Sequence, residues 1–526
     1  MKRYITKVFC VLIIISSSCK KTDNDYHEIN EGQIKGISAN YEVVFKSDRL
    51  VIDPTVDWTL DQLSGGDYEY TWKIVATGSS SATALAGTII GTAKKLDLFV
   101  NIDPGSYTLY FKARDKKTDV TWTKSTTLNV TTLAGRGFLL LGDDKDGYAD
   151  LQMITIKSTG EEFILKNLLA NNGLPRLKGA IEVMYTGTPQ GSAKDNRKLW
   201  VMTKDGGYYL NPLNFESSTE FRLPPMAYIS FPTPSEFYPV KLFPATIDGK
   251  QLSSDRGALM NNGYFIKNDN VTVSTPEFYS DALNTIAGVP VVIAPYIAYT
   301  LSNGLSGSIF YDRTNKQFIS NASFSYVSSV VTTAQLAAPL GFPWNQSVTN
   351  RDLVYMENTM DKAGSTSTLA STIGNTYALM KDPQSNLFIY KFYPRTRVQL
   401  GYFPLTKNFA PGLDAADKYA FYSNRSIMFY TVGNKLFGYD FSVGFEKAKL
   451  IKDFGSDQIT MLKFDVQNSS TGFNDLYVAT YNATSGGTLR RFSVENNPND
   501  VNASETKSWS GLVKIMSIDW RNDQSL

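Results

Sequence analysis

The sequence predicts an all-β protein, a β-sandwich followed by a β-propeller that its own C-terminal strand closes. Short apolar runs separated by turn residues recur along the 526 residues, and long helical patterns are scarce. From residue 135 onward, three such runs form a repeating unit. The last run, VKIMSIDW at residues 513–520, has no partner after it, and the first unit, at residues 135–156, lacks a strand in front of it. Pairing these two would close a ring and remove its sheet edges.

The start of the chain is predicted to be a lipoprotein signal peptide, residues 1–18. Basic residues precede an apolar segment at residues 8–15 that is too short to span a bilayer. The run Ser-Ser-Ser-Cys19 resembles a bacterial lipobox, which implies cleavage before Cys19 and acylation of that residue. Several acyl chains make a durable membrane anchor. The alternative is a plain secretory signal with an incidental cysteine. Residues 19–40 are polar and are predicted to form a tether.

Residues 41–132 are predicted to form an immunoglobulin-like sandwich. They hold about seven short apolar runs with turn residues between several of them. Trp72 stands where a central strand carries a core tryptophan, and Tyr107 follows Pro-Gly as a tyrosine-corner residue does. The order YTWK, KLDLFV, PGSYTLYFKARD resembles the PKD-like family of lipoproteins from Bacteroidetes. That resemblance implies an outer-membrane lipoprotein, exposed at the cell surface beside a SusC/SusD-type transport pair.

Residues 135–526 are predicted to form the propeller. Apolar strand cores recur there at a spacing of roughly 50 to 70 residues, in the range of blades with loop insertions. Most cores are followed by a turn and a second strand, and most are preceded by a third apolar run. We predict about seven blades, with six or eight left open because the outermost strands are hard to recognise.

The composition argues against catalysis or metal binding that depends on histidine or cysteine. The single histidine, His27, lies in the tether, and the two cysteines are Cys10 and Cys19. The folded domains therefore lack the residues for Ser-His-Asp or Cys-His catalysis and for a histidine-ligated metal. We predict no cofactor and no enzyme, with a carboxylate-dependent hydrolase as the alternative, because two acids suffice for glycoside hydrolysis. The net charge of +2, without a basic stripe, predicts that nucleic acid is not a partner.

Two insertions rich in aromatic residues and proline are the predicted ligand-binding loops. Stiff loops that carry Tyr and Trp lose little entropy on binding. The alternative is that these rings pack at blade junctions or cover the central channel. The insertions span residues 223–240 and 338–346, and the residues predicted to bind are Tyr228, Phe231, Phe237, Tyr238, Phe342 and Trp344.

The acidic turn at residues 142–147 is a weak calcium candidate through Asp143, Asp144 and Asp146. Clustered carboxylates suit a hard cation, but the EF-hand spacing is missing. The favoured interpretation is a hairpin turn, in which Asp and Gly supply left-handed conformations.

Together these features predict an outer-membrane-anchored surface lipoprotein without catalytic activity. It would capture a peptide, protein or glycan ligand, or dock onto a SusC/SusD-type nutrient importer, and the family resemblance favours peptide or protein over glycan. The alternatives are a scaffold that binds only the transporter and the carboxylate-dependent hydrolase.

Overall fold

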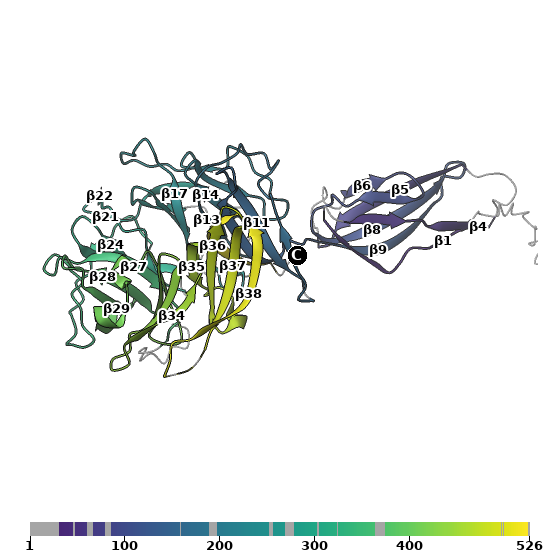
Figure 1. Ribbon diagram of the computed structural model, residues 1–526. Helices are drawn as coiled ribbons and strands as arrows, with labels where there is room; N and C mark the ends of the chain where they lie inside the picture. The colour runs from purple at the N-terminus through teal and green to yellow at the C-terminus, as the bar shows by residue number, and fades with distance from the viewer. Residues whose placement is uncertain are drawn as a thin grey trace, which may run out of the picture. The chain divides into compact units, whose positions relative to one another are not determined.

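The computed structural model describes residues 31–523, apart from 46–47, 60–66, 79–85, 158, 189–196, 252–255, 269–277, 302–303, 323, 363–373, 496 and 498. The predicted signal peptide and Cys19 lie outside these residues. The chain forms two compact units, the first ending at Thr131 and the second beginning at Thr132. Strands dominate both units (Figure 1), which confirms the all-β prediction.

The first unit places a five-stranded sheet and two strand pairs around one core. The sheet has the order β2 (Asn40–Val44), β9 (Thr121–Thr131), β8 (Gly105–Asp115), β5 (Tyr68–Ala76) and β6 (Thr88–Gly91), with β2 parallel to β9. The pairs are β1 (Gly32–Lys35) with β4 (Thr55–Trp58), and β3 (Arg49–Ile52) with β7 (Leu96–Phe99).

Trp72 and Tyr107 make the contacts that the sequence predicts for them. Trp72 is fully buried with its ring centroid 4.6 Å from that of Phe111, and its indole N–H donates to the carbonyl of Ala93 at 3.0 Å. The Tyr107 hydroxyl donates to the carbonyl of Asp103, four residues upstream, at 2.8 Å. A core tryptophan and a tyrosine corner are typical of immunoglobulin-like sandwiches.

In its described residues, the second unit contains seven four-stranded antiparallel sheets, numbered here in chain order. Sheet 1 is β12 (Glu162–Leu165), β11 (Ala149–Ile156), β10 (Arg136–Asp143) and β39 (Lys514–Asn522); sheet 2 is β13 (Ala180–Tyr185), β14 (Leu199–Thr203), β15 (Gly206–Leu210) and β16 (Arg222–Leu223); sheet 3 is β17 (Pro239–Phe243), β18 (Arg256–Met260), β19 (Phe265–Asn268) and β20 (Tyr279–Ala282). Sheet 4 is β23 (Ala298–Thr300), β24 (Gly304–Asp312), β25 (Gln317–Asn321) and β26 (Ser329–Val330); sheet 5 is β27 (Asp352–Asn358), β28 (Thr376–Lys381), β29 (Leu387–Tyr393) and β30 (Val398–Pro404). Sheet 6 is β31 (Lys418–Phe421), β32 (Ile427–Val432), β33 (Lys435–Asp440) and β34 (Lys447–Asp453); sheet 7 is β35 (Gln458–Phe464), β36 (Asp475–Asn482), β37 (Gly486–Val494) and β38 (Ala503–Leu512).

Short elements lie in the connections. A small hairpin, β21 (Thr285–Ile286) with β22 (Val289–Pro290), separates sheets 3 and 4. The 3-10 helices η2 (Lys407–Phe409) and η3 (Leu413–Ala415) precede sheet 6, and η4 (Ser469–Thr471) connects β35 to β36.

The C-terminal strand completes sheet 1, as the sequence predicts. Strand β39 pairs antiparallel with β10, from Arg136 opposite Asn522 to Asp143 opposite Lys514. The register shifts at Gly142, where an added Cβ would stand 2.3 Å from the carbonyl oxygen of Lys514, so the pairing requires glycine at this position.

Apolar clusters fill the junctions between consecutive sheets, including the junction between sheets 7 and 1. Both faces of the middle strands are therefore buried. Strand β14, LWVMT, and strand β28, TYALMK, are buried along nearly their whole length. This is why these strands appear in the sequence as continuous apolar runs instead of alternating ones.

Seven strands, β13, β17, β23, β27, β31, β35 and β39, are called the inner strands here because they line a common interior. All but β17 contact the next along the chain, and β39 contacts both β35 and β13. Sheets 3 and 4 meet through Phe243 and Tyr299, with ring centroids 5.9 Å apart. The inner strands thus form an uninterrupted circuit. The yellow end of the chain in Figure 1 belongs to sheet 1, where β10 lies between β39 and β11.

Polar side chains of one inner strand bind backbone N–H groups of the next. Asp519 accepts from the N–H of Tyr185 at 2.7 Å, and Glu357 accepts from the N–H of Phe421 at 2.6 Å. An inner strand is the edge of its sheet, so its outward N–H groups have no ladder partner. These bonds satisfy such groups and join neighbouring sheets.

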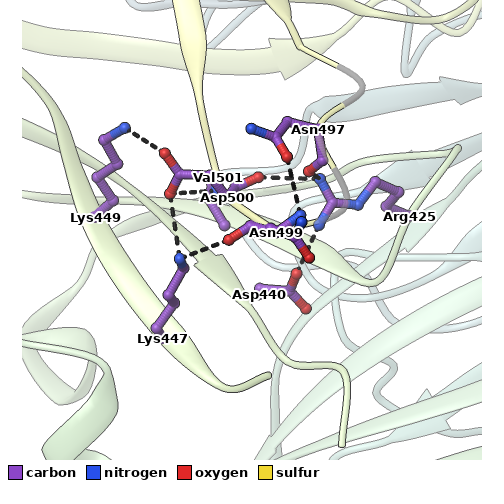
Figure 2. Close-up of polar contacts among 8 residues, drawn as sticks. All are labelled: Arg425, Asp440, Lys447, Lys449, Asn497, Asn499, Asp500 and Val501. Atoms are coloured by element: carbon purple, nitrogen blue, oxygen red, sulfur yellow. Dashed lines mark hydrogen bonds and ion pairs between the residues drawn. The ribbon is translucent and has the colours of Figure 1, made fainter. Parts of the chain in front are cut away.

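A charged cluster anchors the β37–β38 loop to sheet 6 (Figure 2). Arg425 pairs with Asp440 at 2.8 Å and donates to the carbonyl of Asp500 at 3.1 Å. Lys447 and Lys449 hold the carboxylate of Asp500 at 3.4 and 2.8 Å. The charges of this cluster are paired within it, which identifies it as a structural clamp.

Candidate functional site

Phe342 and Trp344 lie in the core, so their predicted binding role is corrected to a packing role. Phe342 is fully buried and stacks on Tyr390 with ring centroids 4.2 Å apart. Trp344 packs edge-on against Phe318 at 5.5 Å. Both rings belong to the cluster between sheets 4 and 5. The insertion folds inward at this junction, which is the alternative that the sequence left open.

The other aromatic loop, residues 223–240, stays at the surface. Tyr228 is 77% exposed. Phe231 and Phe237 are half-buried against the ring of Tyr264, with centroids 6.3 and 6.4 Å away. Tyr238 is also half-buried. None of these four lines the cavity described below, and their binding role stays a prediction.

The acidic turn between β10 and β11 is a hairpin whose carboxylates already have partners. Asp144 accepts from the N–H of Asp146 at 2.8 Å and pairs with Arg176 at 2.8 Å. Asp143 accepts from the N–H of Ala180 at 3.0 Å. The connection is a hairpin turn, the interpretation that the sequence favours, and Asp143 and Asp144 hold it together. Nowhere in the described ranges do three or more His, Cys, Asp or Glu residues group as metal ligands.

A cavity of about 240 Å³ lies between the inner strands. Its lining comes from β13, β17, β27, β35 and β39 and from the segment that leads into β23. Six of the seven sheets thus contribute to one site. Sheet 6 adds the backbone N–H of Phe421, which binds Glu357.

Glu182 and Lys241 form an ion pair on the wall of this cavity. The carboxylate and the ammonium are 3.5 Å apart, and their side chains are 23% and 43% exposed. The pair joins β13 of sheet 2 to β17 of sheet 3. Both side chains line the cavity and are partly exposed, so a ligand there can contact both charges.

Glu357 is the second acid of the cavity. Burial raises its pKa to about 7, against the opposing effects of its bonds to the Phe421 N–H and to Tyr355 and of the charges on Lys241 and Lys463. Burial likewise raises the pKa of Tyr355 well above its usual value. A carboxyl group that titrates near neutral pH can take or release a proton, as a binding or a catalytic group does.

Asp519, the third acid, has a structural role. Burial raises its pKa to about 6. One of its oxygens accepts from the N–H of Tyr185 at 2.7 Å and the other from the amide of Gln467 at 2.8 Å. Lys463 donates to the carbonyl of Ile518 at 2.8 Å. These bonds attach β39 to sheets 2 and 7, so these groups are committed to holding the strands.

Aromatic rings line another part of the wall. Tyr296 meets Tyr355 edge-on with centroids 5.3 Å apart, and Tyr355 stacks on Phe421 at 6.2 Å. Rings beside a few charged groups are the usual composition of a small-ligand site.

Sequence reasoning missed this cavity, although a signal was present. Each of five apolar runs carries a charged residue within or next to its strand core: Glu182 in IEVMYTG, Lys241 in YPVKLFPA, Glu357 in DLVYMEN, Lys463 in ITMLKFD and Asp519 in VKIMSIDW. Charged residues in a buried strand need partners or water, so they indicate an interior cavity.

The acids of the cavity predict how stability depends on pH. The pKa values of Glu357, about 7, and Asp519, about 6, are raised by folding, so the folded state binds protons more strongly than the unfolded chain. Their contribution is therefore present at low pH and is lost as pH rises through these values. We expect Glu357→Gln to remove on the order of 2 kcal/mol of the stability difference between pH 5 and pH 8.

Urea unfolding of the second unit at both pH values, followed by tryptophan fluorescence, measures this effect. Glu220→Gln, at an exposed position, is the control. An unchanged pH dependence in Glu357→Gln would show that the carboxyl is ionised in the folded protein throughout.

Part of the chain matches a known family. Residues 20–176 match the PKD-like family, which covers the first unit and the start of the second. No curated protein is similar in sequence to this chain. Among the described residues, no helix has the length and apolar character needed to cross a membrane.

Likeness to solved structures is distant. A quinonprotein alcohol dehydrogenase-like protein from Bacteroides thetaiotaomicron is 11% identical, with a TM-score of 0.38 over 94% of this chain and 99% of that one. A chain of the nidogen/laminin complex is 10% identical, with a TM-score of 0.29 over 74% of this chain and all of that one. The WD40 domain of SCAP from fission yeast is 8% identical, with a TM-score of 0.22 over 72% and 75%. TM-scores below 0.5 carry no argument about function.

Proposed function

We propose that the protein is a non-catalytic binding lipoprotein, anchored in the outer membrane by Cys19 and exposed at the cell surface. It captures a ligand for a SusC/SusD-type importer or docks onto one. The lipobox-like run and the match of residues 20–176 to the PKD-like family support this proposal. The seven sheets are proposed to be the blades of a closed β-propeller, supported by the circuit of inner strands and by the β10–β39 pairing.

The single observation that carries ligand capture is the Glu182–Lys241 pair in the cavity between the inner strands. A partly exposed carboxylate and ammonium, set side by side, complement a ligand that carries both charges. The ends of a short peptide have this property, since one is an ammonium and the other a carboxylate. Neutral glycans lack it. The cavity volume of about 240 Å³ suits the end of a peptide rather than a long segment.

Charge removal at this pair should weaken peptide binding at least tenfold, because both variants lose a charge-assisted contact. Glu182→Gln and Lys241→Met are compared by calorimetry with di- and tripeptides and with neutral oligosaccharides. Lys435→Met is the matched control, since Lys435 pairs with Asp453 at the same 3.5 Å on the surface. Peptide binding that is equal in all four proteins would remove the cavity from the proposal. Selective retention of the oligosaccharides would replace peptide by glycan.

A second candidate function is a carboxylate-dependent hydrolase, favoured by the raised pKa of Glu357 beside Glu182 in one cavity. An acid with a pKa near 7 and an ionised acid are the pair that glycoside hydrolysis needs. Product analysis by mass spectrometry after incubation with the same panel separates the candidates. Turnover that disappears in Glu357→Gln means an enzyme, and retention without turnover means capture. If the protein shows no turnover and no retention, it is a scaffold.

Anchoring has its own test. Cys19→Ala should release the protein from membranes or leave it unprocessed, because the acylated thiol and amine are both lost. Membrane fractionation with metabolic lipid labelling measures this. A variant that still fractionates as a lipidated protein would contradict the lipoprotein assignment.

A further inference from the structure

A second cavity, of about 460 Å³, lies between sheets 1 and 7. It shares no lining residue with the cavity between the inner strands. Its walls carry two guanidinium groups, a phenol, an indole and hydroxyl groups, from Arg136, Tyr477, Arg491, Ser493, Thr506 and Trp520. The lining also includes the acids Glu162 and Asp475 and the apolar side chains of Phe138 and Ile156.

Arg136 brings a positive charge that no acid neutralises within the described part of the chain. Its guanidinium carbon is 5.8 Å from the centroid of the Trp520 ring, and the side chain is exposed. Arg491 donates through Nε to the hydroxyl of Thr506 at 3.1 Å and has only a long contact, 3.8 Å, with Asp475.

One acid of this cavity, Glu162, is fully paired, and the other, Asp475, has only the long contact with Arg491. Both oxygens of Glu162 have partners, the indole N–H of Trp509 at 2.7 Å and the ammonium of Lys507 at 2.7 Å. Asp475 lies beside Arg491, and burial raises the pKa of its carboxyl. The charge of Arg136 is therefore the uncompensated one.

A buried donor of the cavity also lacks a partner. The indole Nε1 of Trp520 is buried and makes no hydrogen bond within the described residues. Buried indole N–H groups are usually hydrogen-bonded. The Tyr477 hydroxyl lies beside Arg491, and burial raises the pKa of this phenol, so it stays protonated and able to donate. Both groups lie beneath the surface of the cavity, so the donors that a ligand can reach are the guanidinium groups.

We propose that this cavity binds a carboxylate-bearing ligand, with its carboxylate on Arg136 and Arg491. Guanidinium groups hold carboxylates through paired, charge-assisted hydrogen bonds. The hydroxyls of Ser493 and Thr506 supply further polar contacts for the rest of the ligand. The carboxylate can belong to an acidic sugar or to an acidic amino acid, and this site is independent of the peptide site proposed above.

Calorimetry with the full-length protein tests this with four probes: glucuronate, N-acetylglutamate and their neutral counterparts glucose and N-acetylglutaminamide. We expect one acid to bind at least tenfold more tightly than its neutral counterpart. Arg136→Gln and Arg491→Gln should each weaken that binding at least tenfold. The matched control is Arg176→Gln, which removes an arginine stacked on Tyr148 at 3.7 Å elsewhere on the surface.

The acid that binds identifies the source of the carboxylate. Arg136 is exposed and has no ion pair in the described residues, so Arg136→Gln should fold even if Arg491→Gln does not. Absence of binding by both acids at millimolar concentration overturns the proposal, and so does unchanged binding in Arg136→Gln. Loss of acid binding in Glu182→Gln would move the ligand to the other cavity and also overturn it.

Discussion

Deletion of residues 511–526 is expected to unfold the whole second unit and leave the first unit folded. The deletion removes β39, so the full length of β10 from Arg136 to Asp143 loses its partner strand. An exposed edge of this length is prone to aggregation. It also removes the bonds of Asp519 to sheets 2 and 7.

The apolar side chains of β39 and of the residue before it bury enough surface to rival the stability of a domain. Val513, Ile515, Ile518 and Trp520 are each at most 6% exposed. Burial of such side chains contributes about 1.5–3 kcal/mol each, so the four are worth on the order of 10 kcal/mol. A domain is typically stable by about 5–15 kcal/mol. Met516, which the sequence pattern also places in the core, is 38% exposed and lines the inner cavity, so it is left out of this sum.

Limited proteolysis of the truncated protein, with mass spectrometry of the surviving fragments, measures the outcome. Among the described strands, none of the first unit pairs with one of the second, so a fragment ending near Thr131 should persist. A protease-resistant fragment from about residue 135 to residue 510 would show that the ring does not need its closing strand.

The second large effect is expected for Asp523→Ala, at the end of β39. Asp523 is fully buried, binds Arg197 at 2.6 Å and the hydroxyl of Tyr185 at 2.8 Å, and lies 3.9 Å from Arg521. Arg521 is itself fully buried. Removing one partner of a buried pair leaves an uncompensated charge, which typically destabilises by about 3–5 kcal/mol.

Urea unfolding of the second unit measures the Asp523→Ala effect. The control is Asp453→Ala, whose partner Lys435 is exposed and whose ion pair should contribute about 0–1 kcal/mol. If the two variants are equally stable, the buried network contributes no more than a surface pair does. If a second substitution, Arg197→Met, restores stability to Asp523→Ala, the charge argument is supported. This substitution removes one of the cations that lose their partner in Asp523→Ala.

The candidate sites show how far sequence patterns reach. Tyr228 is exposed, as a binding residue on a loop should be, whereas Phe342 and Trp344 are buried. Phe342 and Trp344 are flanked by glycine and proline, which occur both in loops that turn outward and in loops that fold into a junction between sheets. The flanking residues therefore do not distinguish the two cases. The cavity acids Glu182 and Glu357 are far apart in sequence and come from sheets 2 and 5. Local sequence patterns do not predict which of these distant side chains line the same cavity.

What the sequence determined by itself was the strand class of both units, the roles of Trp72 and Tyr107, and the pairing of the chain's last strand with residues 136–143. Apolar runs and turn residues form strands and turns locally, so a sequence shows them directly. The first and last strands of the second unit each lack a partner in the sequence pattern, so each is the expected partner of the other. Only the tertiary structure decided which charges face a common cavity, because that depends on how each sheet is rotated against the next. Glu182 of sheet 2 and Lys241 of sheet 3 became an ion pair through packing between sheets, which no run of residues specifies.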